Sequence, residues 1–375
     1  MKKSGFRVTP WEVSGNVDYE RIIREFGVEK ITPAINKKIE TLAGDSNPLL
    51  RRGIFFAHRD LNWLLGEYEK GNKFFLYTGR GPSGQMHLGH LLPLIFTKWL
   101  QDCFDVELWI QFTDDEKFFF KKELDFDTIE SNMKDNMADV IALGFDQKKT
   151  HFIVDTLHAK LLYKEACKVA KKITYSNVKA AFGLNDQSNI GMIFYTAMQA
   201  VPAFLPSIIA GRNIPCLIPH AVDQDPHFRL TRDIMPKLGY HKPASIQCSF
   251  LPPLTGVSGK MSSSEATTAI YTTDNAKTVE NKIRKYAFSG GKDTVESHRK
   301  HGGNPDVDVS FQYLKYMFEP DDRKLKKIEE DYRFGRLLTS ELKVITIEKI
   351  NAFLKNHQQQ REKAKNKIDE FLYKG

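Results

Sequence analysis

The stretch Lys73-Phe-Phe-Leu-Tyr-Thr-Gly-Arg-Gly-Pro-Ser-Gly-Gln-Met-His-Leu-Gly-His90 carries most of the information about the fold. Residues 73–77 are rich in aromatic and apolar side chains and predict a buried strand, and the apolar spacing of residues 91–101 predicts a helix. Glycines between them let the backbone approach a ligand, and the first turn of a helix offers unpaired N–H groups. The sequence therefore predicts a nucleotide site at this turn.

Two histidines, His87 and His90, lie at the start of the predicted helix. The glycines lack the spacing of a dinucleotide fingerprint, and no Gly-Lys-Ser/Thr ends the turn as in a P-loop. On one side of a first helical turn, two imidazoles could donate hydrogen bonds to triphosphate oxygens, with Gly89 leaving room between them. Taken alone, the pair could also be surface residues or a chance metal pair.

Further apolar runs predict four more strands, with helical segments between them. They are residues 106–113, 150–155, 214–219 and 244–250. Strands that alternate with helices imply a parallel sheet. The fold class is therefore predicted to be α/β, with a Rossmann-like parallel-sheet catalytic domain at residues 73–274.

The segments on either side of this domain have a different pattern. Residues 1–72 form an N-terminal extension, with a possible short strand pair around Thr9-Pro-Trp-Glu-Val13 and helical stretches that include residues 54–70. Residues 275–375 predict an all-helical C-terminal domain. Its amphipathic segments are residues 275–288, 307–318, 340–354 and 361–373.

A second loop of small residues, Gly256-Val-Ser-Gly-Lys-Met-Ser-Ser-Ser264, follows the last predicted strand. A mobile lysine can place its ammonium against phosphates as charge builds on leaving pyrophosphate, while serine hydroxyls supply short donors. On its own, the loop could be a serine-rich linker between domains. Its place after the last strand makes Lys260 a candidate partner of the histidine pair.

The bulk composition is that of an ordinary globular protein. The net charge of +8, from 55 basic and 47 acidic residues, could attract a polyanion such as nucleic acid, although most basic clusters are solvated helix faces. The four cysteines are far apart, which argues against a disulfide framework or a close-spaced zinc site. No apolar stretch is long enough to cross a bilayer. We expect a cytoplasmic protein.

Together, the two motifs resemble the His-Ile-Gly-His and Lys-Met-Ser-Lys-Ser signatures of class I aminoacyl-tRNA synthetases. Leu88 takes the place of the isoleucine, and Ser263 takes the place of the second lysine. The negative phosphate charge that this lysine would have offset must then be offset by Lys260, Mg²⁺ or Arg80. The His-x-Gly-His element is shared with smaller nucleotidyltransferases and by itself indicates adenylyl transfer only. The resemblance implies that ATP is a substrate and that Mg²⁺ accompanies it.

The resemblance also implies roles for residues in both motifs. Those expected to be catalytic are His87, His90, Arg80, Lys260, Ser262 and Ser264. Those expected to contact ATP are Thr78, Gly79, Gly81, Gly89, Met261, Ser263 and Asp223. Asp223 follows a predicted strand, at the strand end where open α/β sheets bind ligands.

Further segments look like tryptophanyl-tRNA synthetases of the archaeal and eukaryotic branch, and this likeness covers nearly the whole chain. They are residues 77–83, 110–117, 197–202, 221–226 and 287–291. The N-terminal Pro10-Trp11 and residues 51–60 are also similar, and in the family the hairpin with the Pro-Trp pair folds over the ATP site.

The family likeness implies a tryptophan site. An indole needs a flat apolar slot and one acceptor for its N–H. The residues expected to surround tryptophan are Tyr77, Gln111, Glu116, Gln199 and Gln224, with Tyr77 and Gln111 closest to the indole N–H. Each could instead be a solvated strand end. Asp114, Asp115 and Glu116 could suggest a metal, but adjacent acids on an extended segment cannot all face one point, so we assign no protein-bound metal.

The expected partners are L-tryptophan, ATP and tRNA(Trp), and the family likeness implies a homodimer, with its interface around the segment inserted after the first half of the sheet. The helical C-terminal domain is expected to bind the anticodon. Lys292 and Asp293 match a family segment near the anticodon, although an interdomain turn would explain them equally well.

Three other functions remain open at this point. A tyrosyl-tRNA synthetase would share the fold and the mechanism, but a phenol pocket typically needs a carboxylate against the hydroxyl. A small-molecule adenylyltransferase would not need a long basic helical C-terminus. A non-catalytic RNA-binding relative is disfavoured because both ATP motifs look intact.

Overall fold

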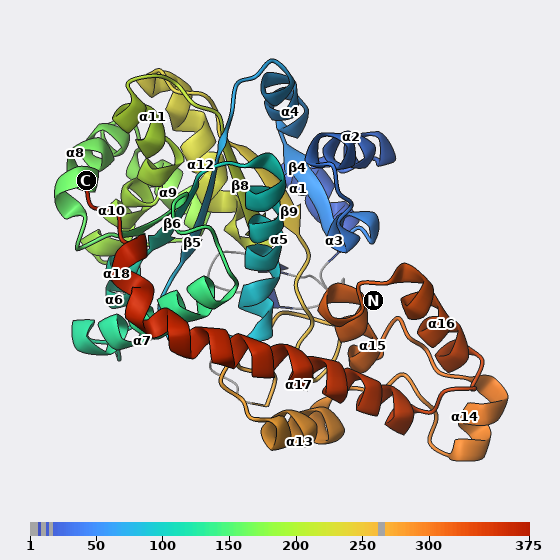
Figure 1. Ribbon diagram of the computed structural model, residues 1–375. Coiled ribbons are helices and arrows are strands. Elements are labelled where there is room, and N and C mark those ends of the chain that lie inside the picture. Colours follow the sequence, from blue (N-terminus) through green and yellow to red (C-terminus); the bar gives the residue numbers. More distant parts are fainter. Residues whose placement is uncertain (1–6, 9–12, 15–17, 262–266) are drawn as a thin grey trace.

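The computed structural model describes residues 7–8, 13–14, 18–261 and 267–375. A seven-stranded sheet lies at its centre, with the strand order β3-β4-β9-β8-β5-β6-β7 (Figure 1). Its strands are β3 (Glu29–Lys30), β4 (Phe55–Arg59), β5 (Phe75–Arg80), β6 (Leu108–Phe112), β7 (Thr150–Val154), β8 (Cys216–Ala221) and β9 (Ala244–Cys248). The predicted α/β class is confirmed.

The five strands that are neighbours in the order β9-β8-β5-β6-β7 are mutually parallel. Strand β4 pairs antiparallel with β9, and β3 pairs antiparallel with β4 at the edge of the sheet. The chain builds β5, β6 and β7 outward in one direction, then returns to place β8 on the other side of β5. In open α/β sheets, ligands bind outside the carboxyl ends of the strands at such a reversal. The expected site thus lies where β5 and β8 end.

Helices cover both faces of the sheet. Successive side chains of a strand point to opposite faces, so each strand contributes side chains to both layers. Phe75 and Tyr77 of β5 pack into one buried cluster and Leu76 into the other. The Tyr77 side is covered by α8 (Ala159–Ala170), α9 (Tyr175–Phe182), α10 (Ile190–Met198), α11 (Leu205–Ala210) and α12 (Asp225–Ile234). The Leu76 side is covered by α2 (Pro33–Ala43), α3 (Pro48–Arg51), α4 (Leu61–Glu69), α5 (Leu88–Phe104) and α7 (Phe126–Ala142).

Residues 275–375 form helices only. They are α13 (Ala276–Tyr286), α14 (Val295–His301), α15 (Val309–Tyr313) with a π-helical turn at Leu314–Phe318, α16 (Asp322–Arg333), α17 (Thr339–Ala364) and α18 (Ile368–Phe371). Their buried side chains, such as Tyr313, Leu342 and Ile350, belong to the same cluster as Leu76. The helical region therefore shares a hydrophobic core with the sheet. The domain limits at 72 and 274 stay predictions.

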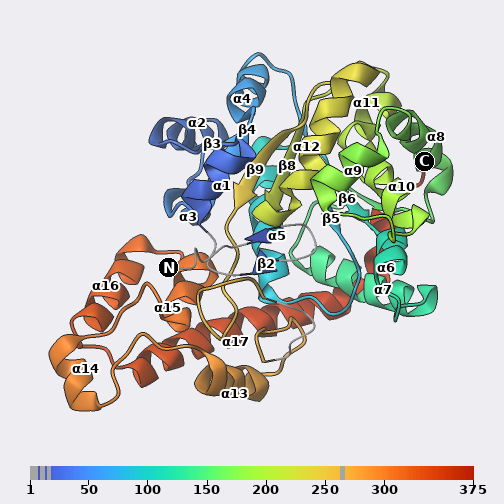
Figure 2. The ribbon, with the colours of Figure 1, turned by 180° about the vertical axis from the view of Figure 1, so that it is seen from behind.

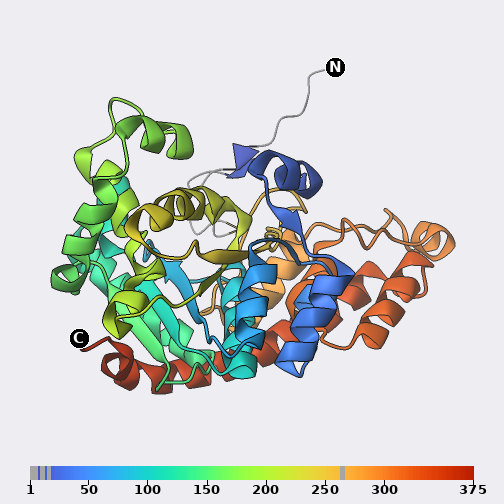
Figure 3. The same cartoon turned by 90° about the horizontal axis from the view of Figure 1, so that it is seen from above.

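Helix α17 links the two ends of the molecule. It runs below the sheet from the α14–α16 group toward α7 (Figure 1, Figure 2). After α18, the main-chain N–H of Tyr373 donates to the carbonyl of Phe152 in β7 over 3.0 Å. Seen from above, the C-terminal end lies across the molecule from the orange C-terminal helices (Figure 3).

Two predicted elements differ from the structure. Residues 54–70 were expected to be helical, but Phe55–Arg59 is strand β4, because the aromatic run packs into the sheet and Asp60, at φ 50°, breaks the chain direction before α4. The gap expected between helices at 340–354 and 361–373 is absent, because no glycine or proline interrupts residues 355–360 and α17 continues to Ala364. The rest of the second segment forms a 3₁₀ turn at Lys365–Lys367 and α18.

The remaining elements lie near the N-terminus and at the end of β6. The predicted strand pair is present as β1 (Arg7–Val8) against β2 (Val13–Ser14), whereas Pro10 and Trp11 lie outside the described residues. Helix α1 (Tyr19–Phe26) follows β2, and α6 (Asp114–Phe120) follows β6. Within the described part of the chain, no helix has the length and apolar character needed to cross a membrane.

Candidate active site

A cavity of about 650 Å³ lies where β5 and β8 end. Its wall holds most of the residues predicted for ATP binding and catalysis. They are Thr78, Gly79, Arg80, Gly81, His87, Gly89, His90, Asp223, Lys260 and Met261, joined by Gln224. The turn after β5 and the loop after β9, which are far apart in the sequence, therefore meet at one site.

The glycine-rich turn begins later than the sequence suggested. β5 continues to Arg80, so that Thr78, Gly79 and Arg80 are strand residues. Gly81 is approached closely by the ends of two side chains, because a Cβ there would lie 2.0 Å from Cε of Lys117 and 2.8 Å from Oε2 of Glu116, and both side chains would have to shift. Glycine at this point thus lets the first turn of α6 pack against the turn.

His87 and His90 form a stacked pair at the start of α5, with 3.6 Å between ring centroids and 18° between ring planes. The main-chain N–H of His87 donates to Nδ1 of His90 over 3.2 Å. A neutral imidazole whose Nδ1 accepts a hydrogen bond carries its proton on Nε2. His90 can therefore offer an Nε2–H donor to a ligand.

Both histidines are uncharged at neutral pH. Burial, reinforced by the positive charges of Arg80 and Lys260, lowers the pKa of His87 to about 3. Burial also lowers the pKa of His90 well below its usual range. The rings are thus donors without charge, and the positive charge at the cavity wall comes from Arg80, Lys117, Lys121 and Lys260.

Gly89 leaves room for an imidazole, as the sequence suggested. A Cβ at Gly89 would lie 3.1 Å from both Nδ1 and Cε1 of His87, whereas Sδ of Met261, at 3.5 Å, would be at an ordinary contact distance. The absence of a side chain at Gly89 therefore lets the ring of His87 stack on that of His90.

Arg80 is held by a residue that the sequence analysis missed. Its Nε donates to Oδ1 of Asn136 over 2.5 Å, and Asn136 is fully buried in α7. The amide of Asn136 donates to the carbonyl of Gly84 in the glycine-rich turn over 2.9 Å. Burial lowers the pKa of Arg80 to about 10, which keeps the guanidinium charged at neutral pH. A polar residue on the buried face of a helix was the only signal for Asn136.

Lys260 is engaged by a neighbouring carboxylate. Its Nζ lies 2.7 Å from Oδ2 of Asp223, which is buried at the end of β8. Lys260 itself retains an exposed fraction of 31%. The two residues predicted for catalysis and for ATP binding thus pair with each other in this conformation, and Lys260 must leave Asp223 to reach a phosphate.

Three of the residues predicted to surround tryptophan, Tyr77, Gln111 and Gln199, are hydrogen-bonded to one another, and Gln224 lines the cavity. The hydroxyl of Tyr77 lies 2.6 Å from Oε1 of Gln111 and 3.0 Å from the carbonyl oxygen of Gln199. Glu116 is nearby in α6, where it accepts hydrogen bonds from Thr113 and Lys117. Tyr77, Gln111, Glu116 and Gln199 are all buried, which excludes the solvated strand end as an explanation.

An acidic cluster lies next to this group. One carboxylate oxygen each from Asp114, Asp115 and Asp155 lies within 4.8 Å of the other two. The sequence analysis assumed that Asp114 and Asp115 lie on an extended segment and cannot face one point. That assumption is wrong, because they begin helix α6, and Asp155 joins them from the end of β7.

Other predicted residues lie elsewhere. Ser262, Ser263 and Ser264 fall outside the described residues. Lys292 and Asp293 are exposed in the turn between α13 and α14. A Cβ at the preceding Gly290 would lie 2.0 Å from the carbonyl oxygen of Asn304, so this turn is packed tightly against the chain.

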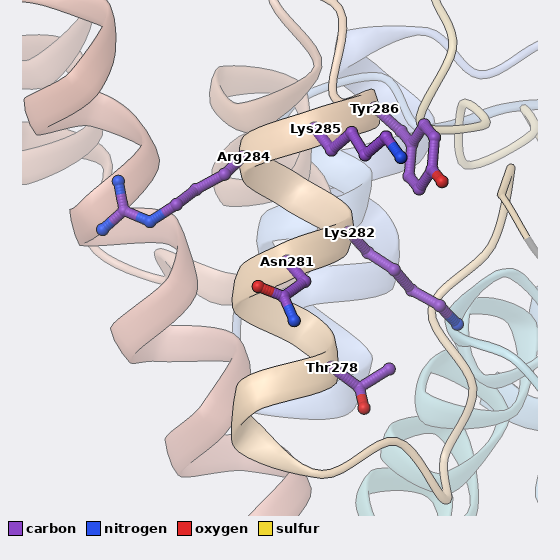
Figure 4. Close-up of a pocket in the computed structure, with 6 residues that line it drawn as sticks. All are labelled: Thr278, Asn281, Lys282, Arg284, Lys285 and Tyr286. Atoms are coloured by element: carbon purple, nitrogen blue, oxygen red, sulfur yellow. The ribbon is translucent and has the colours of Figure 1, made fainter.

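A second hollow lies on α13, but it is not a convergent site. Figure 4 shows Lys282 and Arg284 on opposite sides of the helix. Nζ of Lys282 lies 2.6 Å from Oδ2 of Asp274, and Nε of Arg284 lies 2.7 Å from Oε1 of Glu280. Two of its three cations are therefore already paired with carboxylates, and the third, Lys285, lies over the ring of Tyr286 at 5.2 Å from its centroid.

Known proteins resemble this chain along nearly its whole length. The family model described as class I tRNA synthetases (W and Y) matches residues 69–355. A tryptophan–tRNA ligase of Sulfurisphaera tokodaii is 55% identical, over 99% of this chain and 96% of that protein. Two solved structures covering 95% and 96% of this chain are also similar. They are a tryptophanyl-tRNA synthetase from Giardia lamblia (39% identity, TM-score 0.89, 96% of that chain) and one from Encephalitozoon cuniculi bound to tryptophan (36% identity, TM-score 0.85, 100% of that chain).

These similarities agree with the site. The family model spans β5 with its histidine turn, the loop with Lys260 and the group around Tyr77 and Gln111. The small-molecule adenylyltransferase and the tyrosyl alternative have no such support among these relatives, which carry the tryptophan name. The chain belongs to the class I tRNA synthetases and, within them, to the tryptophan–tRNA ligase family.

Proposed function

We propose that this chain activates L-tryptophan with ATP and transfers it to tRNA(Trp). A carboxylate oxygen of tryptophan attacks the α-phosphorus, the bond to the β-phosphate oxygen breaks, and pyrophosphate leaves. A ribose hydroxyl at the 3′ end of tRNA then attacks the tryptophanyl carbonyl, loses its proton and releases AMP. The substrate supplies its own nucleophile, so the protein acts by positioning and by charge stabilisation.

One observation carries this proposal. Neutral donors from His87 and His90 and cations from Arg80 and Lys260 line a single cavity. The Tyr77–Gln111–Gln199 group lies next to it, because the ring of Tyr77 packs edge-on against Phe228 of the cavity wall, with 5.9 Å between ring centroids. A triphosphate and an aromatic amino acid can thus meet at the end of one strand.

The phosphate roles follow from the charges. Nε2–H of His90 is proposed to donate to the triphosphate, and Arg80 to offset its negative charge. Lys260 is proposed to exchange Asp223 for the leaving pyrophosphate. Mg²⁺ is expected to arrive with ATP, and none of these roles depends on a metal held by the protein.

The proposed contacts with the tryptophan substrate follow from the hydrogen-bond acceptors in the group around Tyr77. Oε1 of Gln111 and the hydroxyl of Tyr77 are proposed to receive the indole N–H. Glu116, Gln199 and Gln224 are proposed to fix the α-ammonium and carboxylate. Oε1 of Gln199 is buried and has no hydrogen-bond partner among the described residues, so it is available for an ammonium.

The experiment that tests the function is ATP–pyrophosphate exchange with each of the twenty amino acids. Exchange that depends on tryptophan alone is the expected result. Exchange that depends on tyrosine would favour the tyrosyl alternative, and exchange with no amino acid would contradict both. Charging of tRNA(Trp) transcripts then tests the second step.

We further propose that residues 275–375 bind the anticodon. Lys292 and Asp293 are exposed on the turn between α13 and α14, where Gly290 packs closely against Asn304. Single-stranded loop bases are recognised by exposed polar and aromatic side chains. Lys292→Ala should raise KM for tRNA without changing pyrophosphate exchange.

A homodimer is proposed through the segment between β7 and β8. This segment exposes Leu157, Tyr163 and Ile190, whose exposed fractions are 64%, 58% and 83%. Exposed apolar side chains of this size commonly mark an interaction surface. Gel filtration with light scattering should give the mass of a dimer. A cytoplasmic location remains part of the proposal.

A further inference from the structure

Both ends of the Gln111 side-chain amide are hydrogen-bonded. Its Oε1 accepts from the Tyr77 hydroxyl at 2.6 Å, and its Nε2 donates to Oδ1 of Asp155 at 2.7 Å. Gln111 and Asp155 each have an exposed fraction of 1%. Water does not compete for these bonds, so Asp155 decides which end of the amide faces Tyr77.

This choice matters because the two ends of an amide have opposite roles. The oxygen is an acceptor, and the nitrogen carries two donors. An indole N–H can bind only to an acceptor. If the amide turned over, the NH₂ group would face the indole N–H, and two donors would oppose each other in a buried site. A partner that accepts from Nε2 prevents this.

Asp155 is suited to be that partner. Its Oδ1 is occupied by Gln111, and its Oδ2 is buried with no hydrogen-bond partner among the described residues. Burial and the neighbouring Asp115 raise the pKa of Asp155 well above its usual range. This shift favours the protonated carboxyl group, and a proton on Oδ2 leaves Oδ1 as the acceptor for Gln111.

A cation is the other means of neutralising Asp114, Asp115 and Asp155. Hard cations bind about six to eight oxygens in proteins. In this cluster, however, both oxygens of Asp114 accept from Thr156, Oδ1 of Asp115 accepts from the N–H of Glu116, and Oδ1 of Asp155 accepts from Gln111. Four of the six carboxylate oxygens therefore already accept hydrogen bonds within the protein, which favours a proton over a cation.

We propose that Asp155 is a positioning residue for tryptophan selection, which holds the Gln111 amide with its oxygen toward Tyr77 and the indole N–H. The inference rests on the proposed function. Asp155 does not touch the substrate, and its effect is exerted through Gln111.

The test compares tryptophan with β-(benzothiophen-3-yl)alanine, in which sulfur replaces the indole N–H. Dissociation constants come from calorimetry, and kcat and KM from pyrophosphate exchange. In Asp155→Ala, we expect tryptophan binding to weaken about tenfold to a hundredfold, mainly in KM, because a buried donor loses its acceptor. Binding of the sulfur analogue should change less than about twofold, since it makes no such hydrogen bond.

Two further variants show whether the effect passes through the amide. Asp155→Asn keeps an oxygen for Nε2 of Gln111 and is neutral, so it should retain discrimination between the two ligands. Gln111→Ala should weaken tryptophan binding by itself, and Asp155→Ala should add little in that background. Asp114→Ala is the matched control, because it removes a carboxylate of the same cluster that bonds Thr156 and not Gln111.

The outcomes separate this inference from the function. Wild-type protein without tryptophan-dependent exchange would contradict the proposed function. With wild-type exchange intact, equal losses for both ligands in Asp155→Ala, or loss of discrimination in Asp155→Asn, would overturn the positioning role. The same loss of discrimination in Asp114→Ala would also overturn it.

Discussion

At the residue scale, Lys260 has two competing partners, Asp223 in this structure and a phosphate during catalysis. Lys260→Ala should slow adenylate formation by about 10²–10³-fold, because one cation no longer meets the charge on the leaving pyrophosphate. Tryptophan binding should stay nearly unchanged, since Tyr77 and Gln111 have their own partners. Pyrophosphate exchange and calorimetry measure the two effects. Lys292→Ala is the control, and full exchange activity in Lys260→Ala would contradict the role.

The charge state of His87 makes a second prediction at this scale. Its pKa is about 3 in the folded protein, against about 6.5 in an unfolded chain. Above pH 6.5 the ring is neutral in both states. As the pH falls from 6.5 toward 3, only the unfolded chain binds the proton, so stability is lost in this window. Imidazole NMR signals of His87 should remain those of a neutral ring at pH 5.5. A titration step near pH 6.5 would contradict the buried, stacked geometry.

At the element scale, helix α7 supports the turn after β5 through Asn136. Its side chain accepts from Arg80 and donates to the carbonyl of Gly84, which fixes both the cation and the turn. Asn136→Ala should lower kcat of pyrophosphate exchange about tenfold, because Arg80 loses its orientation. The dissociation constant for tryptophan should not change. Asn132→Ala, one turn earlier on α7, is the control, since Asn132 contacts Asn136 through its main chain. An equal loss in both variants would indicate a general effect on the helix.

Elements are also where sequence prediction succeeded and failed for physical reasons. The strands with continuous apolar runs, such as residues 214–219, were located because burial on both faces leaves a clear signal. β4 was missed because a short aromatic run before α4 is compatible with either a strand or a helix. The motif residues around the cavity were predicted, whereas Asn136 and Asp155 act through partners that are distant in sequence, and periodicity does not identify such partners.

At the scale of the whole molecule, one buried side chain joins three parts of the chain. Oδ1 of Asp139 in α7 lies 2.9 Å from Nε2 of His357 and 3.2 Å from Nε of Arg361, both in α17. Its Oδ2 accepts from the hydroxyl of Thr272, before α13, at 3.1 Å. Asp139 therefore ties the helical region to the helix that also carries Asn136.

Removing this carboxylate tests whether the sheet and the C-terminal helices are stable only together. Asp139→Ala leaves the buried Arg361 without one of its anions, which should cost about 3 kcal/mol of unfolding free energy. Because the hydrophobic core is continuous from Leu76 to Ile350, the wild-type protein should unfold in one calorimetric transition, and the variant in one transition at lower temperature. Glu130→Gln, which removes an exposed pair with Lys134, should leave the midpoint unchanged. Separate unfolding of the C-terminal helices in wild-type protein would contradict the shared core, because the two parts would then be stable independently.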